Sequence, residues 1–176
     1  MKKILIISQH KSQRGALKAA VEMEKVLKLK TNNKVIFFSE KYVVHTKVNF
    51  LKIKIFKNIN RFIKPLFWGK NKITNSLPQI FKFFDHKKYN CDLVLVNHIN
   101  EFFSVRDIIL FRKPTVVFIH DMWFLGGIKH FFTKRSFKKD LNDKFFSVYG
   151  LLNFLALKFK KYYLTKNRKI IFVASS

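Results

Sequence analysis

Residues 114–127 read PTVVFIHDMWFLGG, and this stretch decides how the rest of the sequence is interpreted. A proline precedes a continuous run of β-branched and aromatic residues at 115–119, which is typical of a strand buried on both faces. The run stops at His120, Asp121 and Trp123, and Gly126 and Gly127 follow shortly afterwards. A strand that only fills a core does not need His, Asp and Trp side chains at its end. We therefore predict that this strand delivers polar groups to a ligand.

Four further apolar runs extend the pattern along the chain, at residues 4–7, 35–38, 93–96 and 170–173. Because they are continuously apolar, we expect strands of a parallel sheet that is covered on both faces. The segments between them predict helices at 16–29, at 77–84 with Ser76 as cap, and at 105–111 with Ser104 and Asp107 as a capping box. Alternating strands and helices predict a doubly wound, Rossmann-like α/β fold, with residues 1–176 forming one domain.

Residues 47–67 are strongly two-sided when they are projected as a helix. One arc carries Val48, Leu51, Ile55, Phe56, Ile59, Phe62, Ile63 and Leu66, and the opposite arc carries Lys47, Lys54, Lys57, Arg61 and Lys64. Two interpretations stay open: a helix packed on the sheet with a solvated outer face, or a basic amphipathic helix on anionic lipid headgroups. In the second, the membrane-facing residues are Lys54, Lys57, Arg61 and Lys64. Residues 133–168 also predict helix over much of their length, with Gly150 as an interruption.

The chain is strongly basic, with 36 Lys and Arg against 10 Asp and Glu and a formal net charge of +26. Such a field favours an anionic partner, either an acidic membrane face or nucleic acid, although lysines solvated on every face would give the same count. A single cysteine, Cys91, excludes an internal disulfide and fits a reducing compartment. The longest uncharged run, 145–157, is too short to span a bilayer. We expect a cytoplasmic protein, with peripheral attachment to the inner face of the cell membrane as the alternative.

Polar loops follow three of the predicted strands. They read SQHKSQRGA at 8–16, NHINE at 97–101 and HDMW at 120–123. Ligands of open parallel sheets bind beyond the carboxyl ends of the strands, so we expect Gly15, His98 and His120 around one site. Gly15 lets the backbone approach a phosphate, and the start of the following helix offers free N–H groups. A histidine at a strand end, taken alone, is more often a structural, hydrogen-bonded residue than a catalytic one.

Residues 120–131, HDMWFLGGIKHF, resemble the segment HDMWPFTGGCHY of a branch of the family-4 glycosyltransferases. Residues 92–103, DLVLVNHINEFF, are similar to the family's D-I-(I/V)-H-L-H-W-I-N-x-G-F, and residues 15–20, GALKAA, to its G-G-A-A-R-A-A. The closing FVASS resembles V-(A/T)-P-S. The resemblance covers the N-terminal domain of that family nearly end to end. This sequence departs from it at Gln13-Arg14-Gly15, where relatives carry two or three glycines, and in lacking the cysteine-rich insert after the HDMW segment.

This resemblance implies a retaining glycosyltransferase of the GT-B fold, in which this domain lies on the acceptor side of a cleft. Sugar would pass from a nucleotide-sugar donor, the co-substrate, to a glycan or lipid-linked acceptor in bacterial surface-polysaccharide assembly. No metal or other cofactor is implied. The implied roles are catalytic for His120 and Asp121 and phosphate-binding for Arg14 and Gly15. Contact with the acceptor or the transferred sugar is implied for His98, Asn100, Trp123, Gly126 and Gly127.

The resemblance also implies that the donor-binding C-terminal domain is absent from these 176 residues. We therefore expect no sugar transfer by the chain alone. Two alternatives stay open: a non-enzymatic basic α/β module that binds an anionic membrane or nucleic acid, and an inactive remnant. Beyond its charge, the sequence carries no signature of RNA or DNA binding, which disfavours nucleic acid as the partner.

Overall fold

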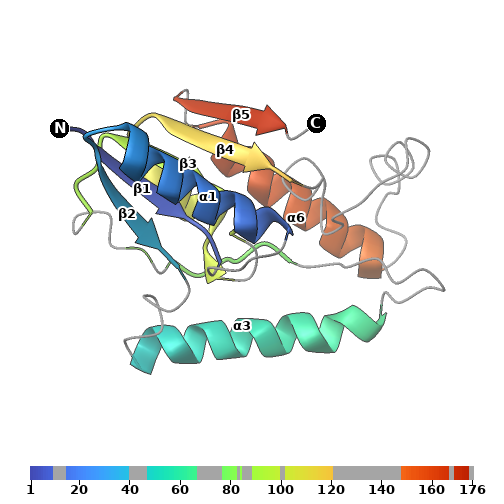
Figure 1. The fold of residues 1–176 in the computed structure, drawn as a ribbon. Helices are drawn as coiled ribbons and strands as arrows, with labels where there is room; N and C mark the ends of the chain where they lie inside the picture. Colours follow the sequence, from blue (N-terminus) through green and yellow to red (C-terminus); the bar gives the residue numbers. More distant parts are fainter. Residues whose placement is uncertain are drawn as a thin grey trace.

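The computed structural model describes residues 1–9, 15–39, 47–66, 77–82, 84, 89–99, 102–120, 148–166 and 169–174. Within them, five strands form one sheet in the order β2-β1-β3-β4-β5, and every neighbouring pair is parallel (Figure 1). The strands are β1 Lys3–Ile7, β2 Lys34–Phe38, β3 Leu93–Val96, β4 Thr115–Ile119 and β5 Ile170–Ala174. All five predicted strands are confirmed, and with them the doubly wound, Rossmann-like α/β fold.

Helices cover both faces of the inner strands, as the continuous apolar runs predict, but the edge strand β5 is exposed from residue 171 to 174. Alternate residues of β1 point to opposite faces: Ile4 and Ile6 belong to one buried cluster, Leu5 and Ile7 to the other. Helix α1 (Gly15–Lys30) packs on the first face through Ala20. Helices α4 (Val105–Leu110) and α6 (Val148–Leu164) pack on the second. A strand without polar alternation is stable here because both of its faces are removed from water.

The predicted helices are confirmed in most of the described chain. Helix α1 covers the predicted 16–29, and α4 is capped by Ser104, whose side chain accepts a hydrogen bond from the backbone N–H of Arg106 at 3.2 Å. Helix α6 runs unbroken through Gly150, which does not interrupt it. The part of the predicted helical region before Val148 lies outside the described residues.

The helix predicted at 77–84 is wrong for the described residues of that segment, 77–82 and 84, which form no regular element. Side chains take the amides that a helix would use. The backbone N–H of Leu77 donates to Asn60 Oδ1 at 2.9 Å, and that of Phe81 donates to Gln79 Oε1 at 3.0 Å. Pro78 between them has no N–H to offer. The proposed cap, Ser76, lies outside the described residues.

Helix α3 (Lys47–Leu66) forms where the two-sided pattern predicts it, and it runs apart from the sheet along the bottom of Figure 1. Ile53, Phe56 and Asn60 of this helix are buried, and Ile53 belongs to the main core cluster. Four side chains of the predicted apolar arc are exposed: Leu51, Ile55, Ile59 and Phe62. Most of the described part of that arc therefore lies at the surface, and Ile53, which packs into the core, stands outside the arc. None of the described helices is both long enough and apolar enough to cross a membrane.

Candidate functional site

The candidate site lies at the carboxyl edge of the sheet, where β1, β3 and β4 end side by side. In the order β2-β1-β3-β4-β5 the chain leaves β1 toward one edge and β3 toward the other. The gap between the ends of β1 and β3 is therefore the topological switch point, the usual ligand position in such sheets. Ser8 follows β1, Asn97 follows β3 and His120 follows β4. The sheet thus places three polar residues at the switch point and beside it.

Backbone hydrogen bonds hold these strand ends in place. The N–H of Asn97 donates to the carbonyl of Ile7 at 2.9 Å, and the N–H of Ser8 donates to the carbonyl of Phe38 at 3.1 Å. The N–H of Gln9 donates to the carbonyl of His98 at 2.7 Å. The ladder between β1 and its neighbours therefore continues past the last strand residues. The backbone positions of the polar residues that follow the strands are therefore fixed by the rigid sheet.

A row of side-chain hydrogen bonds crosses the switch point. Asn97 Nδ2 donates to Ser8 Oγ at 3.4 Å, and Asn97 Oδ1 makes a short hydrogen bond with His120 Nε2. Ser8 and Asn97 are buried, and His120 is half-buried. Buried polar groups are tolerated when they are hydrogen-bonded to one another, and such a row has few alternative arrangements. We call Ser8, Asn97 and His120 the switch-point triad.

The structure orients Asn97 with its amide nitrogen toward Ser8 and its oxygen toward His120. In this arrangement His120 Nε2 donates to Asn97 Oδ1. The bond fixes the orientation of the imidazole ring at the end of β4.

Gly15 opens α1 at the same edge of the sheet, with φ at +54°. A Cβ added there would meet nothing within 4 Å, so the space around the residue does not demand glycine. The left-handed backbone demands it instead. The first turn of α1 contains no acidic residue, and the first N–H groups of a helix suit a bound anion.

The described part of the chain contains some of the predicted site residues and not others. Gly15, His98 and His120 are all at the carboxyl edge, and His98 is half-buried. Outside the described residues lie Arg14, Asn100, Asp121, Trp123, Gly126 and Gly127. The sequence analysis gave no role to Ser8 or Asn97. The sequence does contain a feature that could have indicated both residues, because each is the first polar residue after a continuous apolar run.

The predicted membrane-facing residues lie on α3, away from the triad. Lys54 and Arg61 are exposed, and Lys57 is half-buried. Lys64 belongs to the helix, but its side chain is outside the described part.

Two further observations concern metal and thiol chemistry. Among the described residues, no group of three or more His, Cys, Asp or Glu side chains could hold a metal ion. Burial raises the pKa of the Cys91 thiol above its ordinary value, nearby Lys113 lowers it, and Asp92 raises it. Cys91 is 2% exposed, so its thiol is a core group.

Comparisons with models of protein families, with curated proteins and with solved structures found no match to this chain. A functional proposal therefore rests on the geometry of the strand ends and on the sequence resemblance around His120.

Proposed function

We propose that this chain is the acceptor-side domain of a retaining glycosyltransferase, which transfers a sugar from a nucleotide-sugar donor to a glycan or lipid-linked acceptor. The observation that carries the proposal is the switch-point triad. It occupies the position where open parallel sheets bind ligands, and His120 at its end begins the HDMW segment.

The triad suits a sugar ligand. Asn97 fixes the ring of His120 through Nε2, so the imidazole is oriented before a ligand arrives. Sugar hydroxyls form directional hydrogen bonds, and a preoriented side chain loses little conformational freedom when one binds. In this proposal His120 contacts a hydroxyl of the transferred sugar and holds the ring in place. The bond that breaks joins the anomeric carbon to the diphosphate of the donor.

The departing diphosphate gains negative charge during transfer, and α1 offers a positive helix terminus at the same edge of the sheet. Gly15 begins this helix, and no acidic side chain in its first turn opposes an anion. Fixed dipoles aimed at developing charge stabilise the transition state without further rearrangement. The resemblance assigns the grip on the nucleotide to a second domain, so we expect transfer only when such a domain is supplied.

The test is a chimaera in which this chain precedes the donor domain of an HDMW-branch glycosyltransferase. We expect transfer of labelled sugar from a nucleotide-sugar to a lipid-linked acceptor. His120→Ala should lower kcat by about 10²–10³-fold, the usual effect of losing one fixed polar contact to the reacting sugar. Lys34→Ala, at the amino edge of the sheet, is the matched control and should leave kcat unchanged. Undiminished transfer by the His120→Ala chimaera would contradict the proposal.

A further inference from the structure

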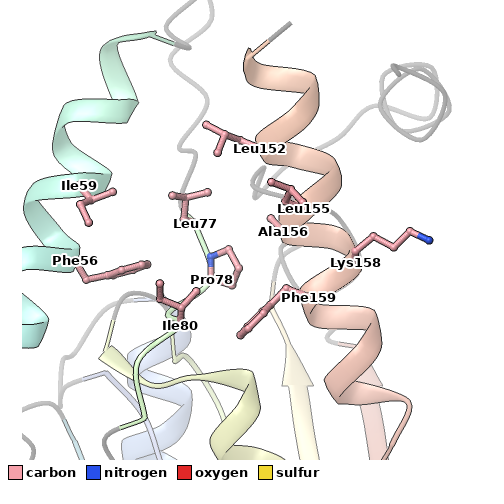
Figure 2. A pocket seen from close by; sticks show the side chains of 10 residues that line it. All are labelled: Phe56, Ile59, Leu77, Pro78, Ile80, Leu152, Leu155, Ala156, Lys158 and Phe159. Atoms are coloured by element: carbon pink, nitrogen blue, oxygen red, sulfur yellow. The ribbon is translucent and has the colours of Figure 1, made fainter. Parts of the chain in front are cut away.

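An apolar groove lies between α3, residues 77–80 and α6, and no residue of the switch-point triad lines it. Its volume is about 440 Å³, within the range of roughly 300–1,000 Å³ that is usual for ligand sites. Phe56 and Ile59 line it from one side and Leu155 from the other, with Leu77 between them (Figure 2). Lys158 is the one charged residue among the described lining residues, and its amino group points away from the groove.

The groove continues into an exposed stripe on α3. Leu51, Ile55, Ile59 and Phe62 are spaced by four, four and three residues, so they share one face of the helix. Their exposed fractions are 56%, 43%, 40% and 77%. Ile59 belongs to both the stripe and the groove lining, so the two surfaces are continuous. Contiguous apolar surface of this kind marks an interaction site.

The surroundings of this apolar surface are positively charged. Helix α3 contains six Lys and Arg and no Asp or Glu, and α6 contains three Lys and no Asp or Glu. Lys54, Arg61 and Lys158 are exposed. Cationic side chains beside an aliphatic stripe match an anionic lipid surface, which offers phosphate at one depth and hydrocarbon just below.

Other occupants match less well. A nucleic acid would use the cations and leave the aliphatic stripe in water. A second copy of this chain would bring another helix of the same positive charge against the first. We propose that α3 and α6 dock on an anionic phospholipid bilayer, with the α3 stripe in the headgroup layer and one lipid acyl chain in the groove. This docking is independent of sugar transfer.

Vesicle co-sedimentation tests the docking. We expect the chain to bind vesicles containing phosphatidylglycerol at 0.1 M salt, and to bind pure phosphatidylcholine vesicles at least tenfold more weakly. The triple variant Leu51→Ser, Ile55→Ser, Phe62→Ser should lose at least tenfold in binding. The control Leu29→Ser, at a residue 85% exposed on α1, should not. Because all four residues are exposed, the variants should fold, which circular dichroism checks.

A charge variant tests the electrostatic part separately. Lys54→Glu with Arg61→Glu should weaken binding by at least 25-fold, since each cation near an acidic surface contributes about fivefold. The control Lys18→Glu with Lys30→Glu, on α1, carries the same change of net charge and should have a smaller effect.

The groove is tested with nitroxide labels in a Cys91→Ala background. A label at Leu155→Cys should become accessible to oxygen and inaccessible to a polar nickel chelate on anionic vesicles, and a label at Leu29→Cys should stay accessible to both. Equal binding to phosphatidylcholine, an unaffected triple variant or a water-exposed label at 155 would overturn the proposal. Duplex DNA binding, or a dimer, that the triple variant abolishes while vesicle binding stays intact would assign the surface to that occupant instead.

Discussion

Asn97 is a buried amide at the end of β3, and three of its polar groups have partners at the ends of two other strands, β1 and β4. Its backbone N–H donates to Ile7, its Nδ2 to Ser8, and its Oδ1 meets His120. A short polar side chain thus ties β1, β3 and β4 together at the candidate site. Removing the amide would leave buried polar atoms without hydrogen bonds, which is more costly than a lost surface contact.

A double-mutant cycle between Asn97→Ala and His120→Ala measures this tie. We expect the two changes to be non-additive, with a coupling of about 0.5–3 kcal/mol in the free energy of unfolding, because the residues share one hydrogen bond. Urea unfolding of the four proteins provides the values. The control cycle pairs Asn97→Ala with Asn33→Ala near the amino edge and should be additive. Additivity in both cycles would show that Asn97 and His120 do not stabilise each other in the folded protein.

Gly15 supports a prediction about backbone conformation. Gly15→Ala should lower the free energy of unfolding by about 1–2 kcal/mol, because alanine at φ +54° brings its Cβ against the following carbonyl. Gly15→Asn should lose less, since asparagine tolerates this region. Urea unfolding distinguishes the two. Equal stability of the wild type and the alanine variant would show that the left-handed conformation is not required.

Cys91 makes the stability depend on pH. Because burial raises the pKa of its thiol, the folded state keeps the proton at pH values where the unfolded state has lost it. The contribution is complete below about pH 8.5, the ordinary thiol pKa, and is lost as pH rises through the folded-state value. For a single proton the slope cannot exceed about 1.4 kcal/mol per pH unit. Urea unfolding between pH 7 and 10 should show a steeper decline for the wild type than for Cys91→Ala. Identical slopes would contradict this.

Among the elements, helix α3 buries one apolar side in the core and exposes the other on the surface. Ile53 is 3% exposed and reaches the core cluster, whereas Ile55 is 43% exposed on the stripe. Sequence periodicity predicted the helix but not this division, because Ile53 lies outside the apolar arc that the spacing gives. That division depends on residues 77–81, which approach α3 through the bond from Leu77 to Asn60 and the ring contact between Phe81 and Phe56.

Two substitutions on α3 separate these roles. Ile53→Ala should lower the free energy of unfolding by about 2–5 kcal/mol, since it removes buried methyl groups and leaves a cavity. Ile55→Ala changes the same residue type on the same helix and should stay within about 0.5 kcal/mol of the wild type. Thermal or urea unfolding gives the comparison. A large loss from Ile55→Ala would place that side chain in the core and remove it from the docking stripe.

The elements also show why most of the fold could be predicted. Each strand contains a short continuous apolar run, and burial on both faces requires nothing else of the inner strands β1 and β3. The run of the edge strand β5 is apolar too, although it is exposed. A helix was predicted at 77–84 because the apolar residues there have helical spacing, but the described residues of this segment form none. The segment is instead held from outside, because Asn60, 17 residues earlier, accepts from the Leu77 amide, and Gln79 takes the Phe81 amide that a helix would direct to residue 77. Local patterns cannot anticipate a partner on another element.

At the scale of the whole molecule, the strand order creates the candidate site. Sequence analysis placed Gly15, His98 and His120 after strand-like runs, and the rule of carboxyl ends brought them to one edge. It gave no role to Ser8 and Asn97, because their contact exists only when β1 and β3 are neighbours. The topology of the sheet decides which strands are neighbours, and a single apolar run in the sequence does not indicate its neighbour.

We infer that sugar ligands bind at the carboxyl edge of the sheet, around the switch-point triad. Nuclear magnetic resonance of the ¹⁵N-labelled chain during titration with nucleotide-sugars and soluble analogues of lipid-linked sugars tests it most directly. We predict saturable shifts of the amides of Ser8, Gly15, His98 and His120, no shift at Lys34 on the amino edge, and loss of the response in His120→Ala. Saturable binding that shifts only amides away from this edge, or that His120→Ala leaves unchanged, would contradict the claim.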